Sequence, residues 1–396
     1  MIVLISSEAV LGLPGYEVTG IEERDGLVCV CASYLGERSC PGCGGKDLRL
    51  KDRRMRSVRH ESWGVRRCSL KLESHKWRCR GCGRLFWQRF AGILPRRRAT
   101  EPFRRTVSLR HLDGISRSAL SRREGIGSAT VERWLHEHLE RRARERSSAA
   151  CPKVLGIDEH FFSRRHGYST TLCDLARQRV FDIVLGRSEA SLEAYMQRLK
   201  GKDRVEVVCM DLSVTYRALA RKYFPQARIV ADRFHVIRLV NHHFLACWKQ
   251  IDPVGSRHRG LVSLMRRHRS RLKSEEQAAN LMAYLDERPG LKAIYDFKQR
   301  LCELLLQKHC SHRKCQSLAK RLVHAIDELR NSKLPYLVQL GETLHSWSEE
   351  IATMWRFTKN NGITEGFHNK METLKRRAYG FRNFENYRLR VRVTCS

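Results

Sequence analysis

The sequence lacks the long apolar stretches that membrane and secreted proteins need. No run approaches the roughly 18 apolar residues of a membrane-spanning helix. The opening MIVLISS is too short for a secretory signal, and no basic region precedes it. The 15 cysteines are an odd number, which disfavours a disulfide framework and favours reduced thiols, some of them metal ligands. We therefore expect a soluble, cytoplasmic protein with no membrane partner.

Acidic residues are scarce relative to basic ones. The chain has 76 Lys and Arg against 42 Asp and Glu, a net charge of +34 at pH 7. Such an excess indicates a polyanionic partner, and nucleic acid is favoured because phosphate contacts release counterions. A basic membrane-binding protein usually concentrates its charge in one short segment, whereas this excess is spread along the chain. The 396 residues and ordinary 42% hydrophobic content allow two or three globular domains.

Two C-x-x-C motifs lie near the front of the chain. Four thiolates at this spacing can close a tetrahedral site around one Zn²⁺ ion, and the ligands are Cys40, Cys43, Cys79 and Cys82. Four protein ligands leave no open position, so the zinc should be structural. The spacer between the motifs exceeds that of an ordinary zinc ribbon and predicts an inserted hairpin. We assign residues 1–95 to an N-terminal strand region and zinc-binding module.

Residues 96–150 have the pattern of a helix-turn-helix domain followed by a linker. Three short helical patterns lie between Glu101 and Arg146, and a Gly-bearing turn at 124–127 separates the second from the third. Ser128 is the expected N-cap of the third helix, which would be the recognition helix. Residues 147–150 (Ser-Ser-Ala-Ala) resemble a linker. The residues expected to contact DNA are Arg96, Arg97, Arg98, Ser128, Thr130 and Arg133.

Residues 151–396 form the expected α/β catalytic domain. Three strand patterns are followed by helix, strand, helix and strand, which is the order of a ribonuclease-H-like fold. Residues 236–358 read as helices only and predict a large all-α insertion. The predicted strands cover residues 154–157, 169–175, 179–185, 205–210 and 227–231. The predicted insertion helices cover residues 236–251, 275–287, 291–307, 314–331 and 342–357.

Aspartates follow the first, fourth and fifth of these strands. In the expected fold the first and fourth strands are neighbours, so Asp158 and Asp211 would lie about 4.8 Å apart, close enough to share divalent metal ions. Asp232 is the rival of Asp211, but its strand should lie one place further out. Glu159 should face the opposite side of its strand from Asp158, and Asp174 and Asp182 are assigned surface or turn roles.

Glu365 is the candidate for a third carboxylate. The segment at 360–365 predicts a helix start, capped by Thr364 or Asn361, with Glu365 in the first turn and the helix running to Arg377. This is a rigid position for a metal ligand. A favourable interaction of Glu365 with the helix dipole explains the same residue equally well, so both interpretations remain open at this point.

Several long strings of this sequence resemble the ISL-three family of bacterial insertion-sequence transposases. The resemblance covers nearly the whole chain and includes both C-x-x-C motifs. The other matching strings are residues 11–15, 156–159, 232–235, 361–369 and 377–388. Strings of this length are far more specific than an isolated C-x-x-C motif.

The resemblance implies a DDE transposase that binds the terminal inverted repeats of its element, cuts the DNA and joins it to a target. It implies the triad Asp158, Asp211 and Glu365, holding two Mg²⁺ or Mn²⁺ ions. Asp232 and His235 match the D-x-x-H element of related transposases and would support the site without binding the metal. The same resemblance implies that the chain binds double-stranded DNA at the element ends and at the target. It also implies a homodimer or higher homo-oligomer and a nucleoid location in bacteria.

Two other classes of function remain as alternatives. A non-catalytic regulator built from a zinc ribbon and a helix-turn-helix would explain the front third, but neither the strand-end aspartates nor the Glu365 segment. A ribonuclease-H-like nuclease would explain the carboxylates but would cut DNA without joining it.

Overall fold

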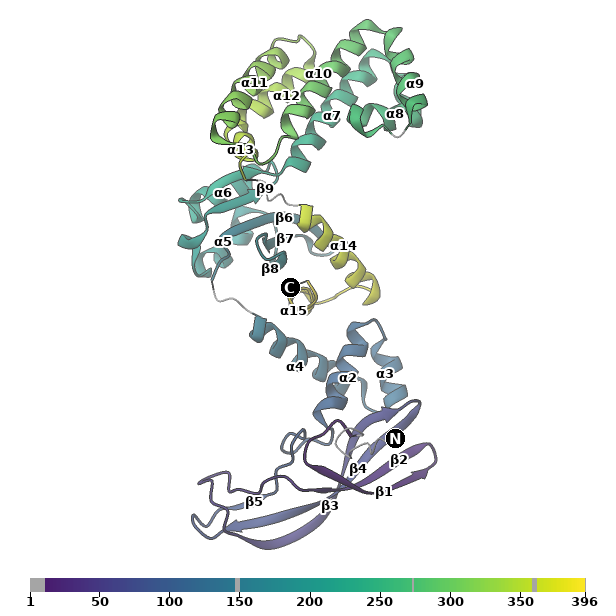
Figure 1. The fold of residues 1–396 in the computed structure, drawn as a ribbon, viewed down its shortest axis with the longest axis vertical. Coiled ribbons are helices and arrows are strands. Elements are labelled where there is room, and N and C mark those ends of the chain that lie inside the picture. The colour runs from purple at the N-terminus through teal and green to yellow at the C-terminus, as the bar shows by residue number, and fades with distance from the viewer. Residues whose placement is uncertain (1–10, 147–149, 273, 358–361, 396) are drawn as a thin grey trace, which may run out of the picture. The chain divides into compact units, whose positions relative to one another are not determined.

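The chain in this computed structural model divides into two compact units, Met1–Arg144 and Glu145–Ser396 (Figure 1). The structure describes residues 11–146, 150–272, 274–357 and 362–395. Within these residues, none of the helices combines the length and the apolar character that a membrane span requires. Each unit has its own buried core.

The first unit is built on a five-stranded sheet of order β1-β2-β4-β3, with β5 paired to β4. Its strands are β1 (Tyr16–Arg24), β2 (Leu27–Tyr34), β3 (Leu48–Trp63), β4 (Arg66–Cys79) and β5 (Leu85–Trp87). The pair β2–β4 is parallel and the other pairs are antiparallel. The β3–β4 hairpin fills the long spacer between the two C-x-x-C motifs, so the predicted inserted hairpin is confirmed.

Three helices complete the first unit: α2 (Glu101–Leu112), α3 (Arg117–Glu124) and α4 (Ser128–Arg146). Their shared core contains Phe103, Leu120 and Trp134. Gly125 ends α3 with a φ of 63°, a left-handed conformation that glycine adopts at little cost. Ser128 is not the N-cap that was predicted. It is the first residue of α4, and the amides of Thr130 and Val131 donate to the carbonyl of Gly127 instead.

The second unit contains a five-stranded sheet of order β10-β9-β6-β7-β8. Strands β6, β7 and β8 form an antiparallel meander, whereas β9 and β10 run parallel to β6. The strands are β6 (Val154–Ser163), β7 (Gly167–Asp174), β8 (Arg179–Leu185), β9 (Val207–Met210) and β10 (Arg228–Ala231). Every residue of β9 is buried, as expected for a parallel strand covered on both faces.

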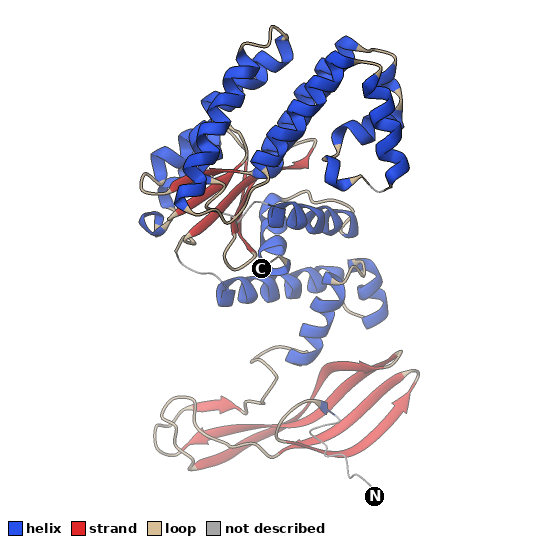
Figure 2. Ribbon diagram, turned by 45° about the horizontal axis from the view of Figure 1, so that its top comes forward, coloured by secondary structure: helices blue, strands red, loops and turns tan. Residues whose placement is uncertain are grey.

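Helices cover both faces of this sheet (Figures 1 and 2). Helices α5 (Glu189–Arg198) and α6 (Val214–Tyr223) lie on one face, and α14 (Gly362–Arg377) lies on the other. Two consecutive residues of β7 define the faces: Thr170 contacts Tyr216 of α6, and Thr171 contacts His368 of α14. The final helix, α15 (Phe384–Thr394), packs against β8.

Between β10 and α14 the described chain contains helices and no strand, which agrees with the predicted all-α segment. The helices are α7 (Arg233–Ile251), α8 (Arg259–Arg266), α9 (Glu275–Asp286), α10 (Pro289–Leu305), α11 (His312–Arg330), α12 (Pro335–Ser346) and α13 (Ser348–Thr353). Two details differ from the prediction. Helix α8 was missed. The single helix predicted over 342–357 is divided between α12 and α13, which begins at Ser348. Helix α12 starts earlier than predicted, at Pro335, a residue favoured in the first turn.

Candidate functional site

The four cysteines of the C-x-x-C motifs converge in the first unit. Their sulfur atoms all lie within 4.8 Å of one another, and the pairs Cys40–Cys82 and Cys43–Cys79 are both 3.5 Å apart. Tetrahedral zinc with Zn–S bonds of about 2.3 Å separates its sulfurs by roughly 3.8 Å, so the donor set fits one zinc ion.

The backbone around these cysteines favours thiolate ligands. The amide of Gly42 donates to the Cys40 sulfur at 3.4 Å, and this hydrogen bond is the main cause that lowers the pKa of Cys40 to about 6. The amide of Gly45 lowers the pKa of Cys43 in the same way, although the three neighbouring sulfurs raise that pKa to about 12 overall. Gly45 leaves room beside the cluster, because a Cβ there would meet the Cys43 sulfur at 3.3 Å. These features suit a closed, structural metal centre.

The second candidate site begins where β6 and β9 pair. Ile157 is opposite Met210 in this parallel pair, so Asp158 and Asp211 are the next residues on adjacent strands. The predicted adjacency of the first and fourth strands is therefore confirmed. The prediction that the first strand ends at Asp158 is wrong, because β6 continues to Ser163 through its pairing with β7. Asp158 lies where β9 stops and only β7 still pairs with β6.

Asp158 and Asp211 occupy an environment that disfavours their negative charge. The pKa of Asp158 is raised to about 7, chiefly by burial and further by the charges of Asp211 and Asp232, against a 2.8 Å hydrogen bond from the Glu159 amide to Asp158 Oδ1. The pKa of Asp211 is raised to about 6, chiefly by burial and next by the charge of Glu159. The Oδ1 atom of Asp211 is buried without a hydrogen-bond partner among the described residues. Clustered carboxylates with an unsatisfied buried oxygen fit the oxygen-ligand preference of a divalent cation.

Asp232 lies one strand further out, as predicted. Ala231 is opposite Met210, so Asp232 is the neighbour of Asp211 rather than of Asp158. Asp232 precedes α7, and its side chain makes no capping hydrogen bond to that helix. His235 Nε2 lies 3.7 Å from Asp232 Oδ2. Burial lowers the pKa of His235, while the charges of Asp232 and Glu365 act in the opposite direction.

Helix α14 carries Glu365 on the Asp158 face of the sheet. Thr364 is fully buried and hydrogen-bonds the Cys173 thiol, and His368 Nε2 contacts Thr171 Oγ1 at 3.1 Å. Thr171 is opposite Asp158 in the β6–β7 register. Glu365 itself is exposed in the first turn. Thr364 is not a cap, because α14 already begins at Gly362, and the other predicted cap, Asn361, lies outside the described residues.

Glu159 faces the other side of β6 from Asp158, as predicted. It is opposite Thr170, whose hydroxyl contacts Tyr216 of α6 at 3.0 Å, and its carboxylate pairs with Arg187 at 3.1 Å. The charge of Glu159 nevertheless raises the pKa of Asp211, so this residue belongs to the electrostatic environment of the site.

Sequence reasoning missed a buried network behind α14. His160 Nε2 lies 2.8 Å from the Tyr387 hydroxyl, and His160 Nδ1 lies 3.1 Å from Thr171 Oγ1. Burial lowers the pKa of His160 to about 3 and that of His368 to about 4, so both rings are neutral near pH 7. The network joins α14 and α15 to the central strands. The position of His160 two residues after Asp158, on the same face of the strand, was a usable signal.

The predicted DNA-contacting residues all lie in the first unit. Arg96 and Arg98 are exposed in the loop before α2, whereas Arg97 is half-buried and pairs with Glu137 at 3.3 Å. Ser128 and Arg133 are exposed on α4, and Thr130 is half-buried. Arg96 has a φ of 60°, an uncommon conformation for a residue other than glycine.

Comparison with known proteins matches two segments of the chain to family models. Residues 36–82 match the family model described as the zinc-finger of transposase IS204/IS1001/IS1096/IS1165. A curated relative from Bordetella parapertussis, the transposase for insertion sequence element IS1001, is 24% identical over 98% of this chain and 97% of its own length. Residues 155–391, more than half of the chain, match the family model of ISL3 transposases. The chain therefore belongs to the ISL3 family of transposases.

Proposed function

We propose that this chain binds the terminal inverted repeats of an insertion sequence, cleaves the DNA at the element's ends and joins those ends to target DNA. The observation that carries the proposal is the β6–β9 register, which makes Asp158 and Asp211 neighbours at the point where β9 ends. The relative's name, a transposase for an insertion sequence element, supports the same reaction class.

We assign the second unit to the ribonuclease-H-like fold. The support is its strand order β10-β9-β6-β7-β8, with an antiparallel meander and two parallel strands reached through helices. Helices α3 and α4, joined by the turn at Gly125, support a helix-turn-helix in the first unit. In this assignment α4 is the recognition helix, and the basic loop at 96–98 contacts phosphates.

The triad in this proposal is Asp158, Asp211 and Glu365. These carboxylates would hold two Mg²⁺ or Mn²⁺ ions, which lower the pKa of an attacking water and stabilise the leaving oxygen. Asp158 is buried, and such low-dielectric surroundings would strengthen electrostatic interactions with the phosphodiester. Asp232 and His235 lie beside the triad, and we assign them a supporting role. The same site would then align the released 3′ hydroxyl with a phosphate of the target DNA.

The direct test is incubation of the full chain with a labelled element end, target DNA and Mg²⁺. Asp158→Asn, Asp211→Asn and Glu365→Gln should each abolish cleavage and joining, because each removes a charge that holds the metal ions. Binding of end DNA should remain largely intact. Combined substitutions should cost no more than single ones, since the three residues act as a unit.

Asp232→Asn is the discriminating variant. A supporting residue should lower the rate about 10–100-fold without eliminating it. Asp327→Asn, an exposed acid on α11, is the matched control and should have no effect. An active Asp211→Asn with a dead Asp232→Asn would reassign the second ligand. Cleavage without joined products would identify a nuclease instead.

We further propose that the chain acts as a homodimer or higher homo-oligomer on the bacterial nucleoid. An insertion sequence has two ends, and one catalytic unit at each end would satisfy both. Sedimentation of the chain with and without end DNA would measure this directly.

A further inference from the structure

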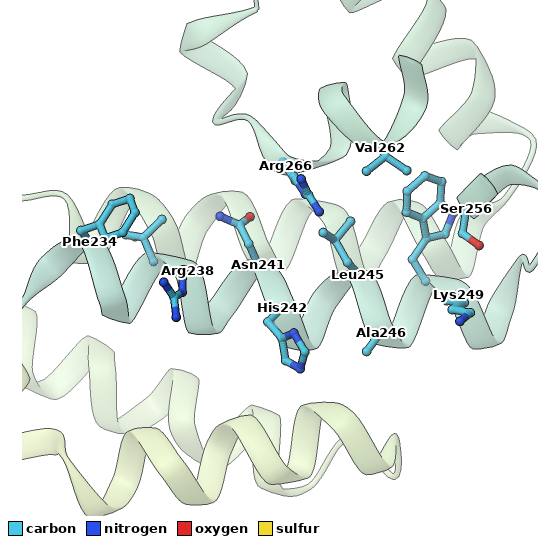
Figure 3. Close-up of a pocket in the computed structure, with 12 residues that line it drawn as sticks. Phe234, Arg238, Asn241, His242, Leu245, Ala246, Lys249, Ser256, Val262 and Arg266 are labelled. Atoms are coloured by element: carbon cyan, nitrogen blue, oxygen red, sulfur yellow. The ribbon is translucent and has the colours of Figure 1, made fainter. Parts of the chain in front are cut away.

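A groove about 650 Å³ in volume follows helix α7 away from the candidate active site. Figure 3 shows Phe234, Arg238, Asn241, His242 and Lys249 along α7, with Arg266 of α8 across from them. With a rise of about 1.5 Å per residue, the stretch from Phe234 to Lys249 is roughly 22 Å long.

The lining of this groove is basic. It includes Arg238, His242, Lys249 and Arg266 and contains no Asp or Glu. In the part of the chain that the structure describes, no carboxylate forms an ion pair with Lys249 or Arg266. An adjoining hollow is lined by further arginines, Arg257, Arg259 and Arg267. Cations without acidic partners favour a polyanionic ligand.

Helix α7, which lines the groove, begins beside the carboxylate cluster. Helix α7 begins directly after Asp232, and Phe234 and Arg238 are in its first two turns. His235 Nε2 lies 3.7 Å from Asp232 Oδ2, and Arg238 is three residues further on, one turn along the same face of α7. Arg238 therefore belongs both to the groove and to the surroundings of the carboxylates.

Two side chains of the groove suit a nucleobase rather than a phosphate. Phe234 is 48% exposed, which is unusual for a large aromatic residue and leaves its surface available for stacking. Asn241 Oδ1 is buried without a hydrogen-bond partner among the described residues, so a donor from a ligand would satisfy it. The amino groups of DNA bases are such donors.

We propose that this groove binds unpaired nucleotides of a DNA strand next to the bond that is cut. The inference rests on the proposed function, because that function supplies the DNA strand. A cavity between about 300 and 1,000 Å³ holds a ligand of drug size, which corresponds to a few nucleotides and excludes a whole duplex. Arg238, Lys249 and Arg266 contact the backbone, and Phe234 stacks on a base.

The test compares two fluorescent probes bound to the full chain in buffer without Mg²⁺ or Mn²⁺, so that no cleavage occurs and the zinc is retained. One is a blunt duplex, and the other is the same duplex with a single-stranded tail of about six nucleotides. The wild type should prefer the tailed probe. Lys249→Glu combined with Arg266→Glu should weaken binding of the tailed probe about tenfold. The slope of log binding constant against log salt concentration should fall in magnitude by about 1.4, and binding of the blunt duplex should not change.

Two further variants complete the experiment. Phe234→Ala changes an exposed side chain and should also weaken tailed binding about tenfold through lost stacking. Arg321→Glu reverses an exposed charge on α11 outside the groove and should change neither probe. Unchanged tailed binding in the groove variants would overturn the inference, and so would an equal loss on both probes. If the groove variants lose binding of the tailed probe alone, but the wild type never cleaves DNA, the result would support the groove inference and contradict the proposed function.

Discussion

At the scale of single residues, the raised pKa values of Asp158 and Asp211 make stability depend on pH. Between about pH 4 and 7 the folded chain retains protons at these carboxyls that the unfolded chain has lost. These two carboxyls therefore contribute stability that is lost as pH rises through this window, because unfolding relieves the buried charges. Their contribution should amount to about 2–4 kcal/mol without bound divalent cations, since one pKa unit corresponds to about 1.4 kcal/mol. The buried His160 and His368, with pKa values lowered to about 3 and 4, act in the opposite direction, so the carboxyl contribution is measured against a variant that lacks it.

Urea unfolding at pH 5 and pH 8, in buffer without Mg²⁺ or Mn²⁺, measures this effect in the wild type and in Asp158→Asn. The wild type should lose stability relative to Asp158→Asn as pH rises, because the amide is neutral at both pH values and the histidines are common to both proteins. Divalent cations should stabilise the wild type more at pH 8 than at pH 5, since the ionised carboxylates bind them. The same change in stability between pH 5 and pH 8 in the wild type and in Asp158→Asn would contradict the proposed environment of these carboxyls.

At the scale of elements, α15 is attached to the sheet through a bidentate ion pair. Arg388 Nε and Nη2 donate to the two carboxylate oxygens of Asp182 at 2.8 and 2.6 Å, and the Tyr195 hydroxyl donates at 3.2 Å. Asp182 was assigned a surface or turn role, but it is buried at β8. Arg388→Leu should destabilise the chain by about 3 kcal/mol, because it leaves the buried Asp182 carboxylate with only one cation, the more distant Arg392, at 3.9 Å.

Urea unfolding also measures this change. Arg376→Ala, an exposed residue of α14, is the control and should cost less than about 0.5 kcal/mol. In the double variant Arg388→Leu with Asp182→Asn much of the loss should be recovered, since the uncompensated charge is gone. Equal losses in the control and in Arg388→Leu would show that the pair contributes nothing specific.

The zinc centre is also a property of elements, because it closes the ends of the β3–β4 hairpin. We expect metal analysis of the full chain to find one zinc ion per molecule, lost when Cys40 and Cys82 are both replaced by serine. Because the thiolates come from both sides of the hairpin, zinc removal should lower the melting temperature of the first unit. The absence of zinc from a folded, reduced protein would contradict this assignment.

At the scale of the whole molecule, the presence of two compact units predicts that each unit has its own function. Selective binding of end DNA should reside in residues 1–146, which contain the zinc module and helices α2–α4. A competition assay with end and random DNA would compare the full chain with Arg133→Ala. Loss of a base contact on α4 should reduce the preference for end DNA by about 1–3 kcal/mol, while binding to random DNA changes little. Equal weakening on both DNAs would make Arg133 a phosphate contact.

The sequence by itself determined the features that depend on local spacing. The C-x-x-C pairs identified the four cysteines that are expected to bind zinc. Hydrophobic periodicity and the order of the elements identified the three strands of the meander, the two parallel strands and the all-helical segment of the second unit. The alternation of side chains along a strand separated Asp158 from Glu159.

Only the tertiary structure decided the features that join distant segments. No local pattern shows that β6 extends past Asp158, because that extension depends on pairing with β7. The burial of Asp182 requires Arg388, which lies about 200 residues later in the chain. Likewise, the groove along α7 exists because α8, a helix that the sequence pattern did not reveal, packs across from it. Such contacts depend on the folded path of the chain, and short-range periodicity carries no information about them.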